Sequence, residues 1–411
     1  MVAELFRKVC EINVEGFGDN GLRFADIDGD GQKEAIFFQG QDYNGIPRIS
    51  SGGYDAEKVI KCITAMRLDG AVLWQYGTPM GFGYWVQYGL AAQVSDLNGD
   101  GVPEVAYVTE REGRSYLRLL DGRRGLFLKE TETGANCVMQ LCDIRGLGSR
   151  RDILVSTYLN PIYIYTGELE VLWNCHFYGG AGHHHDFYDI DGDGKEELFI
   201  GYNCVRADGT KIWWRPDLEP HIEQMTRSPH VDNIKVVDLE GNGQIDELLV
   251  SGKDLICLDA ATGKNKWIFK GKHIQSVTVG DFLPSREGLE MYVAEHRFEG
   301  GLKTYLLDSN GREIWRRENV SYGQAIKVKD IEGDCIFIPY VAPGRPSLVM
   351  DGEGNILQEL DMPPQPTKYM AHGYGGSAGE TYRGRAIDVN GDGASEIVMH
   401  NRRRLWLFEQ S

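Results

Sequence analysis

Residues 186–202 read DFYDIDGDGKEELFIGY, and this stretch decides the fold. Its centre, Asp-Ile-Asp-Gly-Asp-Gly, places carboxylates at alternate positions of a turn, with apolar, strand-like runs on both sides. Similar stretches recur, such as RFADIDGDGQKEAIFF from Arg23 and AQVSDLNGDGVPEVAYV from Ala92. Eight leading aspartates mark the repeat: Asp26, Asp96, Asp143, Asp189, Asp238, Asp281, Asp330 and Asp388. The usual interval is about 40–50 residues, which is typical of one four-stranded propeller blade.

Each repeat also contains a second pair of strand-like runs joined by a tight turn, as at Asn310-Gly311. Tryptophans fall at matching places in the fourth strand, where we expect them to pack between blades: Trp74, Trp173, Trp213, Trp267 and Trp315. The last repeat ends without a fourth strand, whereas Leu5–Val14 precedes the first repeat and has no other partner. We therefore predict an all-β, closed eight-bladed β-propeller, a single domain over residues 1–411, whose last blade is completed by the N-terminal strand.

Four of the turns carry the full acidic pattern, and hard oxygen ligands at this spacing predict structural Ca²⁺. The predicted ligands are Asp26, Asp28, Asp30 and Glu34; Asp96, Asn98, Asp100 and Glu104; Asp189, Asp191, Asp193 and Glu197; and Asp388, Asn390, Asp392 and Glu396. The turn at Asp238 is a weaker variant, and those at Asp143, Asp281 and Asp330 have lost the pattern. An EF-hand is excluded, because loop position twelve holds Phe37 or Ile200 and strands flank the loop. The alternative is that the aspartates only satisfy backbone donors in Asx-type turns.

The formal net charge of −18 argues against nucleic acid and against an anionic membrane surface as partners.

Residues 1–14 show no export signal and no apolar run approaches a membrane span, so we expect a cytoplasmic protein. The eight cysteines are scattered, with no Cys-x-x-Cys pair, which favours buried reduced thiols.

The longer connections of such a propeller fall on the face opposite the Asp-Gly loops, and we expect the functional site there, around the axis. Six of the ten histidines lie at or near this axial mouth: His183, His184, His185, His230, His273 and His372. Adjacent histidines on a strand point to opposite faces, so the run at 183–185 cannot chelate zinc by itself.

With the repeats aligned, the runs HHHDFYDIDGDGKEELFIGY from His183 and PSREGLEMYVAE from Pro284 resemble the rhamnogalacturonan-lyase-like propellers of polysaccharide-degrading bacteria. The resemblance spans all eight repeats and implies an eight-bladed, calcium-binding enzyme. It implies cleavage of a uronate-containing glycan by β-elimination at a site that includes histidines. By the same resemblance, the loop aspartates and, more loosely, His230 and His273 are candidate functional residues.

A β-elimination requires a base, an acid for the leaving oxygen, and a cation beside the uronate carboxylate. We expect His230 and His273 to be base and acid, with His184 or Tyr322 assisting. Predicted contacts to an acidic oligo- or polysaccharide come from His183, Arg297, Arg383, Tyr382, His372, Tyr88 and Trp85. A glycoside hydrolase acting on rhamnose or uronate termini is the alternative, with Asp232 and Glu380 as its carboxylates. A non-catalytic binding propeller of the FG-GAP kind is the third interpretation.

Overall fold

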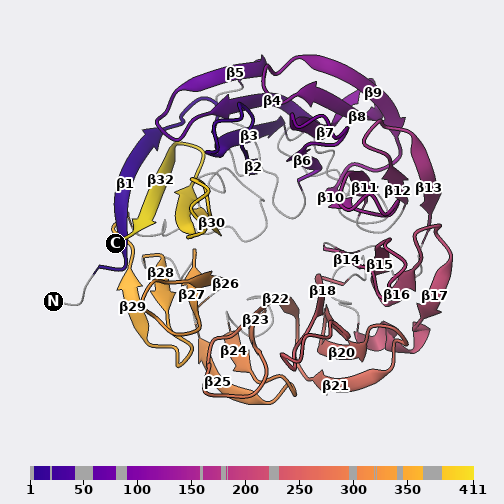
Figure 1. Cartoon of the computed structure of the whole chain (residues 1–411), viewed down its shortest axis with the longest axis vertical. Coiled ribbons are helices and arrows are strands. Elements are labelled where there is room, and N and C mark those ends of the chain that lie inside the picture. The colour runs from indigo at the N-terminus through magenta and orange to yellow at the C-terminus, as the bar shows by residue number, and fades with distance from the viewer. Residues whose placement is uncertain are drawn as a thin grey trace.

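The chain forms a ring of eight four-stranded antiparallel sheets among the residues that the structure describes (Figure 1). This computed structural model describes residues 4–18, 21–41, 59–79, 90–157, 161–176, 182, 184–221, 231–295, 303–318, 320, 322–339, 346–363 and 382–411. Within each blade the first strand lies nearest the axis and the last lies at the rim. The predicted fold is confirmed.

The first four blades follow the order of the chain. Blade one is β2 (Gly21–Ala25), β3 (Glu34–Gln41), β4 (Val59–Met66) and β5 (Val72–Gly77). Blade two is β6 (Ala92–Ser95), β7 (Glu104–Arg111), β8 (Arg114–Asp121) and β9 (Phe127–Thr133). Blade three is β10 (Val138–Cys142), β11 (Asp152–Ser156), β12 (Ile162–Tyr165) and β13 (Val171–Cys175). Blade four is β14 (Asp186–Tyr188), β15 (Glu197–Ile200), β16 (Asn203–Val205) and β17 (Lys211–Trp214), which the 3₁₀ turn Pro216–His221 follows.

The last four blades repeat the pattern. Blade five is β18 (Asn233–Val237), β19 (Glu247–Ser251), β20 (Leu255–Asp259) and β21 (Asn265–Phe269). Blade six is β22 (Ile274–Gly280), β23 (Glu290–Glu295), β24 (Lys303–Leu307) and β25 (Glu313–Glu318). Blade seven is β26 (Gln324–Lys327), β27 (Asp334–Ile338), β28 (Leu348–Met350) and β29 (Ile356–Glu359). Blade eight is β30 (Arg383–Ile387), β31 (Glu396–His400), β32 (Arg404–Gln410) and β1 (Phe6–Asn13).

The ring closes as the sequence predicts, because β1 pairs antiparallel with β32 from Phe6↔Gln410 to Asn13↔Arg404. Phe6 is fully buried in the core between blades seven and eight, and Gln358 of β29 bonds its backbone N–H and carbonyl. The N-terminal strand therefore completes blade eight and also bonds it to blade seven. Such closure protects the strand edges that an open sheet would expose.

Tryptophans in the outer strands of five blades link each of these blades to the next, as predicted. The indole Nε1 of Trp213 donates to the Ala260 carbonyl at 2.8 Å, and its ring lies under Gly263, whose φ is +67°. A Cβ on Gly263 would stand 2.7 Å from that ring, so the turn requires glycine there. The same bond to the following blade is made by Trp74, Trp173, Trp267 and Trp315.

Near the axis, side chains of the innermost strands bond to the backbone of the next blade. Gln140 Nε2 donates to the His185 carbonyl at 2.8 Å, and the Gln140 side-chain oxygen accepts from the His185 N–H. Gln324 bridges blades seven and eight in the same way, to Gly384 and Ala386. These bonds hold the ends of the innermost strands, and with them the axial residues, in fixed positions.

All eight cysteines are free thiols, and six of them are buried. Within the described part of the chain, no helix has the length and apolar character that a membrane span needs.

Candidate functional site

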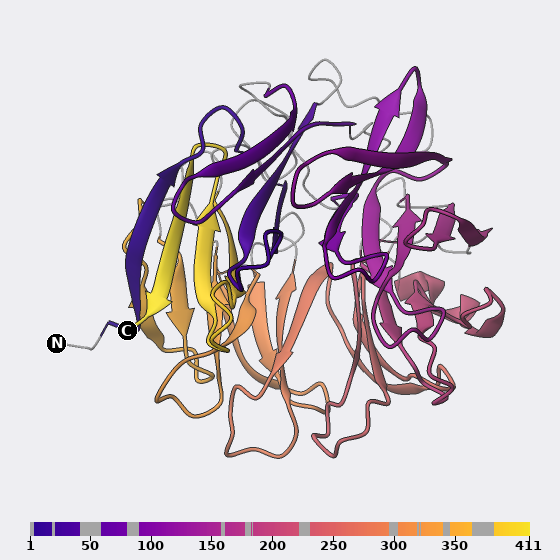
Figure 2. The same ribbon diagram turned by 45° about the horizontal axis from the view of Figure 1, so that its top comes forward.

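The innermost strands of blades four to seven surround a cavity of about 380 Å³ at the axis. Asp186 of β14, Lys235 of β18, Thr278 of β22 and Gln324 of β26 line this cavity. Figure 2 shows the ring tilted, with strands running between its two faces. The innermost strands begin at the face opposite the Asp-Gly loops and lead toward those loops, so the residues just before them lie at the axial mouth.

At this mouth, His273 of blade six meets Asp232 of blade five. His273 Nε2 lies 3.3 Å from Asp232 Oδ2, and both side chains are buried. Gln275 Nε2 donates to the other carboxylate oxygen, Oδ1, of Asp232. The Asp232 backbone N–H is bonded to the Ser251 carbonyl at 2.9 Å, so both the backbone and the carboxylate of Asp232 are held in place. A carboxylate held against an imidazole orients the ring and selects which nitrogen carries the proton.

His184 lies within electrostatic range of the same group. Desolvation by the surrounding ring lowers the pKa of His184 to about 4. The positive charge of Lys235 lowers this pKa further, and the negative charge of Asp232 raises it. The His184 side chain nevertheless has solvent-exposed surface, which places it at the wall of the axial opening and not in a closed core. His184 is therefore neutral near pH 7, and it can accept or donate a hydrogen bond there.

His185, the next residue, has a structural role. It is 3% exposed and its Nε2 lies 3.1 Å from Ser156 Oγ. Burial, reinforced by His184, lowers the pKa of His185 to about 3. Adjacent histidines thus point apart, as the strand geometry predicts.

Two arginines and a lysine give the axial opening a positive character in an acidic protein. Arg23 of β2 and Arg385 of β30 are close enough for their charges to repel. Burial, and after it the charge of Arg385, lowers the pKa of Arg23 to about 9. Both arginines and Lys235 contribute to the field at His184. These three residues occupy the same place, three positions before the leading aspartate of their blades. They are not among the predicted site residues, although aligning that position across the repeats identifies them.

The other predicted axial residues divide into three groups. Arg383, the first residue of β30, and Tyr322, just before β26, are both half-buried at the mouth side of their strands. Tyr382 is 7% exposed and its ring packs edge-on against Trp406, 5.2 Å between centroids, so it belongs to the core of blade eight. Six predicted residues lie outside the described part of the chain: His183, His230, Arg297, His372, Tyr88 and Trp85.

On the opposite face, the leading aspartates organise their loops. Asp189 Oδ1 accepts the Gly192 and Asp193 N–H groups, and Oδ2 accepts that of Gly194 at 2.9 Å. Equivalent bonds form at Asp26, Asp96 and Asp388, and also at Asp143 and Asp238, where the acidic pattern is weaker or lost. The Asx-type turn thus belongs to the repeat itself, with or without the remaining carboxylates.

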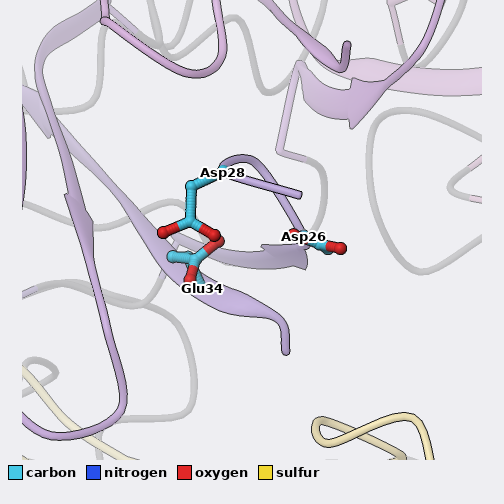
Figure 3. Close-up of side chains that lie close together, drawn as sticks. All are labelled: Asp26, Asp28 and Glu34. Carbon is cyan, nitrogen blue, oxygen red and sulfur yellow. The ribbon is translucent and has the colours of Figure 1, made fainter. Parts of the chain in front are cut away.

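Those remaining carboxylates form clusters that could hold a metal ion. Asp26, Asp28 and Glu34 each offer an oxygen within 4.8 Å of the others, and so do Asp189, Asp191 and Glu197. Figure 3 shows Asp28 and Glu34 facing one another across the loop. Burial, together with the neighbouring aspartates, raises the pKa of Glu34 and of Glu197. Oxygen-only donors crowded with negative charge suit a hard divalent cation, so these residues fit the predicted ion.

In two blades that lack the full acidic pattern, a lysine or arginine side chain lies near the carboxylate that begins the second strand. In blade three, Arg145 stands where Asp28 stands in blade one, and its Nε donates to the fully buried Asp152 at 2.7 Å. In blade five, Lys266 of β21 lies 2.5 Å from Glu247, which is 2% exposed. A fixed side-chain cation therefore neutralises the buried acid that begins the second strand of each of these blades.

These features define the class of the protein: a closed eight-bladed β-propeller of Asp-Gly-loop repeats, with a histidine and carboxylate pair at its axial mouth. No family model matches the chain. In sequence it is similar to rhamnogalacturonan endolyase YesW of Bacillus subtilis (strain 168), with 26% identity over 337 residues, 67% of this chain and 52% of the relative. It is also similar to rhamnogalacturonan exolyase YesX of the same organism, with 25% identity over 359 residues, 72% of this chain and 56% of the relative.

The solved structures agree with this similarity in fold. The crystal structure of YesW superposes with a TM-score of 0.67 at 20% identity, covering 95% of this chain and 71% of that one. The exotype lyase YesX gives a TM-score of 0.68 at 19% identity, with the same coverage. The resemblance to rhamnogalacturonan lyases drawn from the repeats is confirmed. The chain spans about half the length of the curated relatives it matches.

Proposed function

We propose that this propeller is a polysaccharide lyase that cleaves a uronate-containing, rhamnogalacturonan-like glycan by β-elimination at the axial mouth. The observation that carries the proposal is the His273–Asp232 pair, in a propeller similar to rhamnogalacturonan lyases. The positive axial residues support an acidic substrate, because they would attract its carboxylates despite the net charge of −18.

In this mechanism His273 is the base. The Asp232 carboxylate, 3.3 Å from Nε2 of His273, favours the tautomer protonated at Nε2, and Nδ1 then has the lone pair that accepts the substrate proton beside the uronate carboxylate. The electron pair of that C–H bond forms the new carbon–carbon double bond as the glycosidic C–O bond breaks. The leaving oxygen takes a proton from an acid, for which Tyr322 is the described candidate and His230 is the candidate outside the described residues. His184, which is neutral near pH 7, assists through a hydrogen bond.

The substrate carboxylate needs a cation while its neighbouring carbon loses the proton. Arg383 at the start of β30 is the described candidate, and Arg297 lies outside the described residues. Either guanidinium could bind a carboxylate through two parallel hydrogen bonds.

The hydrolase alternative is less well supported by the geometry. A hydrolase would need Asp232 as an acid or base, yet this carboxylate is buried, with Gln275 bonded to Oδ1 and His273 3.3 Å from Oδ2. Glu380, the other carboxylate considered, lies outside the described residues.

We further propose that four Asp-Gly loops bind calcium. The holding residues are the Asp26, Asp96, Asp189 and Asp388 sets, with Glu34, Glu104, Glu197 and Glu396 closing each loop. When bound, the ion neutralises crowded carboxylates and stabilises the turn. Because the loops lie on the face opposite His273, their role is structural.

Mass spectrometry of the products tests the reaction class. Elimination gives two fragments whose masses sum to that of the substrate, whereas hydrolysis adds one water. We expect the first result with rhamnogalacturonan oligosaccharides, and a gain of water would contradict the lyase proposal.

A further inference from the structure

Between blades one and two, on the same face as the axial mouth, lies a pocket of about 230 Å³. We call it the Tyr107 pocket; its lining includes Lys61, Tyr76, Tyr107, Arg111, Tyr116 and Arg118. Its volume is below the roughly 300–1,000 Å³ typical of drug-sized ligands, so it suits a single small ring. It lies toward the rim, where the β7–β8 hairpin and the end of β5 meet.

The residues of this pocket differ from those at the equivalent positions of the other blades. The fourth residue of the second strand is buried in every blade, and it is apolar in seven of them: Phe37, Val155, Ile200, Val250, Val293, Phe337 and Met399. In blade two this residue is Tyr107, and its partner across the strand pair is Arg118. The corresponding partners elsewhere are uncharged: Thr64, Tyr163, Asn203, Ile256, Tyr305, Val349 and Trp406. At this strand position, among the described residues, only blade two buries a phenol opposite a guanidinium, and such a replacement costs free energy unless polar partners are supplied.

Those partners are present. Arg118 Nη1 lies 3.4 Å from both the Tyr76 and Tyr107 hydroxyls, and its Nε donates to Glu130 at 2.7 Å. Arg111 binds the other Glu130 oxygen at 3.0 Å and lies over the Tyr116 ring, 4.4 Å from its centroid. The network fixes tyrosine hydroxyls, guanidinium N–H groups and aromatic rings around one small space.

We infer that the Tyr107 pocket is a second glycan-binding subsite, which holds a single sugar residue of the chain whose backbone reaches the axial mouth. Aromatic rings present a surface for the apolar C–H face of a sugar, and the tyrosine, arginine and glutamate groups match its hydroxyls. Lys61, which is exposed at the rim of the pocket, would favour a carboxylate-bearing residue. The inference rests on the proposed function for the glycan class and for the position of its backbone at the axial mouth.

The test measures binding apart from turnover. Rhamnose, galacturonate and rhamnogalacturonan oligosaccharides are titrated by saturation-transfer NMR and calorimetry into the full chain carrying His273→Ala, which blocks turnover under the proposed mechanism. Added to that chain, Tyr116→Ala should weaken oligosaccharide binding about two- to tenfold. Tyr163→Ala is the matched control. Tyr163 is a half-buried tyrosine of blade three, and it pairs with Val155, which occupies the strand position that Tyr107 has in blade two. Lys61→Ala, at an exposed position, serves as a second variant that leaves the core intact.

Monosaccharide titrations show whether the residue is neutral or acidic. Equal affinity in the parent, Tyr116→Ala and Lys61→Ala chains would overturn the inference, and so would an absence of any sugar binding. Elimination products from the wild type with no effect of Tyr116→Ala would contradict the pocket and leave the lyase proposal standing. Binding that depends on Tyr116, without elimination products from the wild type, would support the pocket and contradict the lyase proposal.

Discussion

His273 Nε2 lies 3.3 Å from Asp232 Oδ2, although the two residues are 41 positions apart in the chain. Each residue stands just before the innermost strand of its own blade, β22 for His273 and β18 for Asp232. The ring packs these strands side by side and thereby brings the two side chains together.

If this pair forms the base, both residues affect turnover, but differently. His273→Ala should lower kcat by about 10²- to 10⁴-fold, the usual contribution of a general base. Asp232→Asn should lower kcat less, leave KM nearly unchanged and alter the pH profile of kcat, because it changes the tautomer and basicity of His273. Steady-state kinetics check both, with His176→Ala, an exposed histidine after β13, as control. Full activity in Asp232→Asn with an unaltered pH profile would count against the positioning role.

Calcium should bind four loops and raise the melting temperature. A cation that binds only the folded chain adds about 2.7 kcal/mol per site at a concentration of 100 Kd. Atomic emission after dialysis should give four calcium ions per chain, and Glu197→Gln should remove one. Asp152→Asn, in blade three, where Arg145 is the cation, should leave the number unchanged. An ion count that is the same in Glu197→Gln would contradict the assignment.

Removing the cation of blade three should destabilise the fold. Arg145→Met leaves the buried Asp152 carboxylate without its guanidinium, at a cost near the lower end of the 3–5 kcal/mol typical of broken buried pairs, about 3 kcal/mol, because Arg145 is partly exposed. Adding Asp152→Asn should restore part of the loss, since the amide is neutral. Urea unfolding of the two variants measures this, and equal stability of Arg145→Met and wild type would refute the role.

Acid should destabilise the protein partly through His185. Its pKa is about 3 in the folded chain, far below the ordinary value of about 6.5. Between these values the unfolded chain binds a proton that the folded chain does not, so stability falls as pH drops from about 6.5 toward 3, by up to about 1.4 kcal/mol per unit. His185→Gln removes this titration, so its unfolding free energy, measured in urea from pH 7 to 4, should fall less steeply. Parallel curves for the two proteins would disprove the contribution.

Local patterns predicted the blades, the closing strand and the linking tryptophans, because each depends on one repeat or its immediate neighbour. The Asp232–His273 contact depends on the ring, and the sequence analysis considered Asp232 only as a hydrolase carboxylate. Lys266 was missed for a similar reason, since it reaches the blade-five loop from the outer strand β21. Tyr382 was expected at the mouth, but contact with Trp406 draws its ring into the core.

The lyase account is tested most directly by near-ultraviolet absorbance during incubation with rhamnogalacturonan oligosaccharides. Elimination creates a double bond conjugated with the uronate carboxylate, which hydrolysis does not. We predict a steady rise in absorbance with the wild-type chain and its loss in His273→Ala. Sugar release without that rise, or an undiminished rise in His273→Ala, would contradict the account.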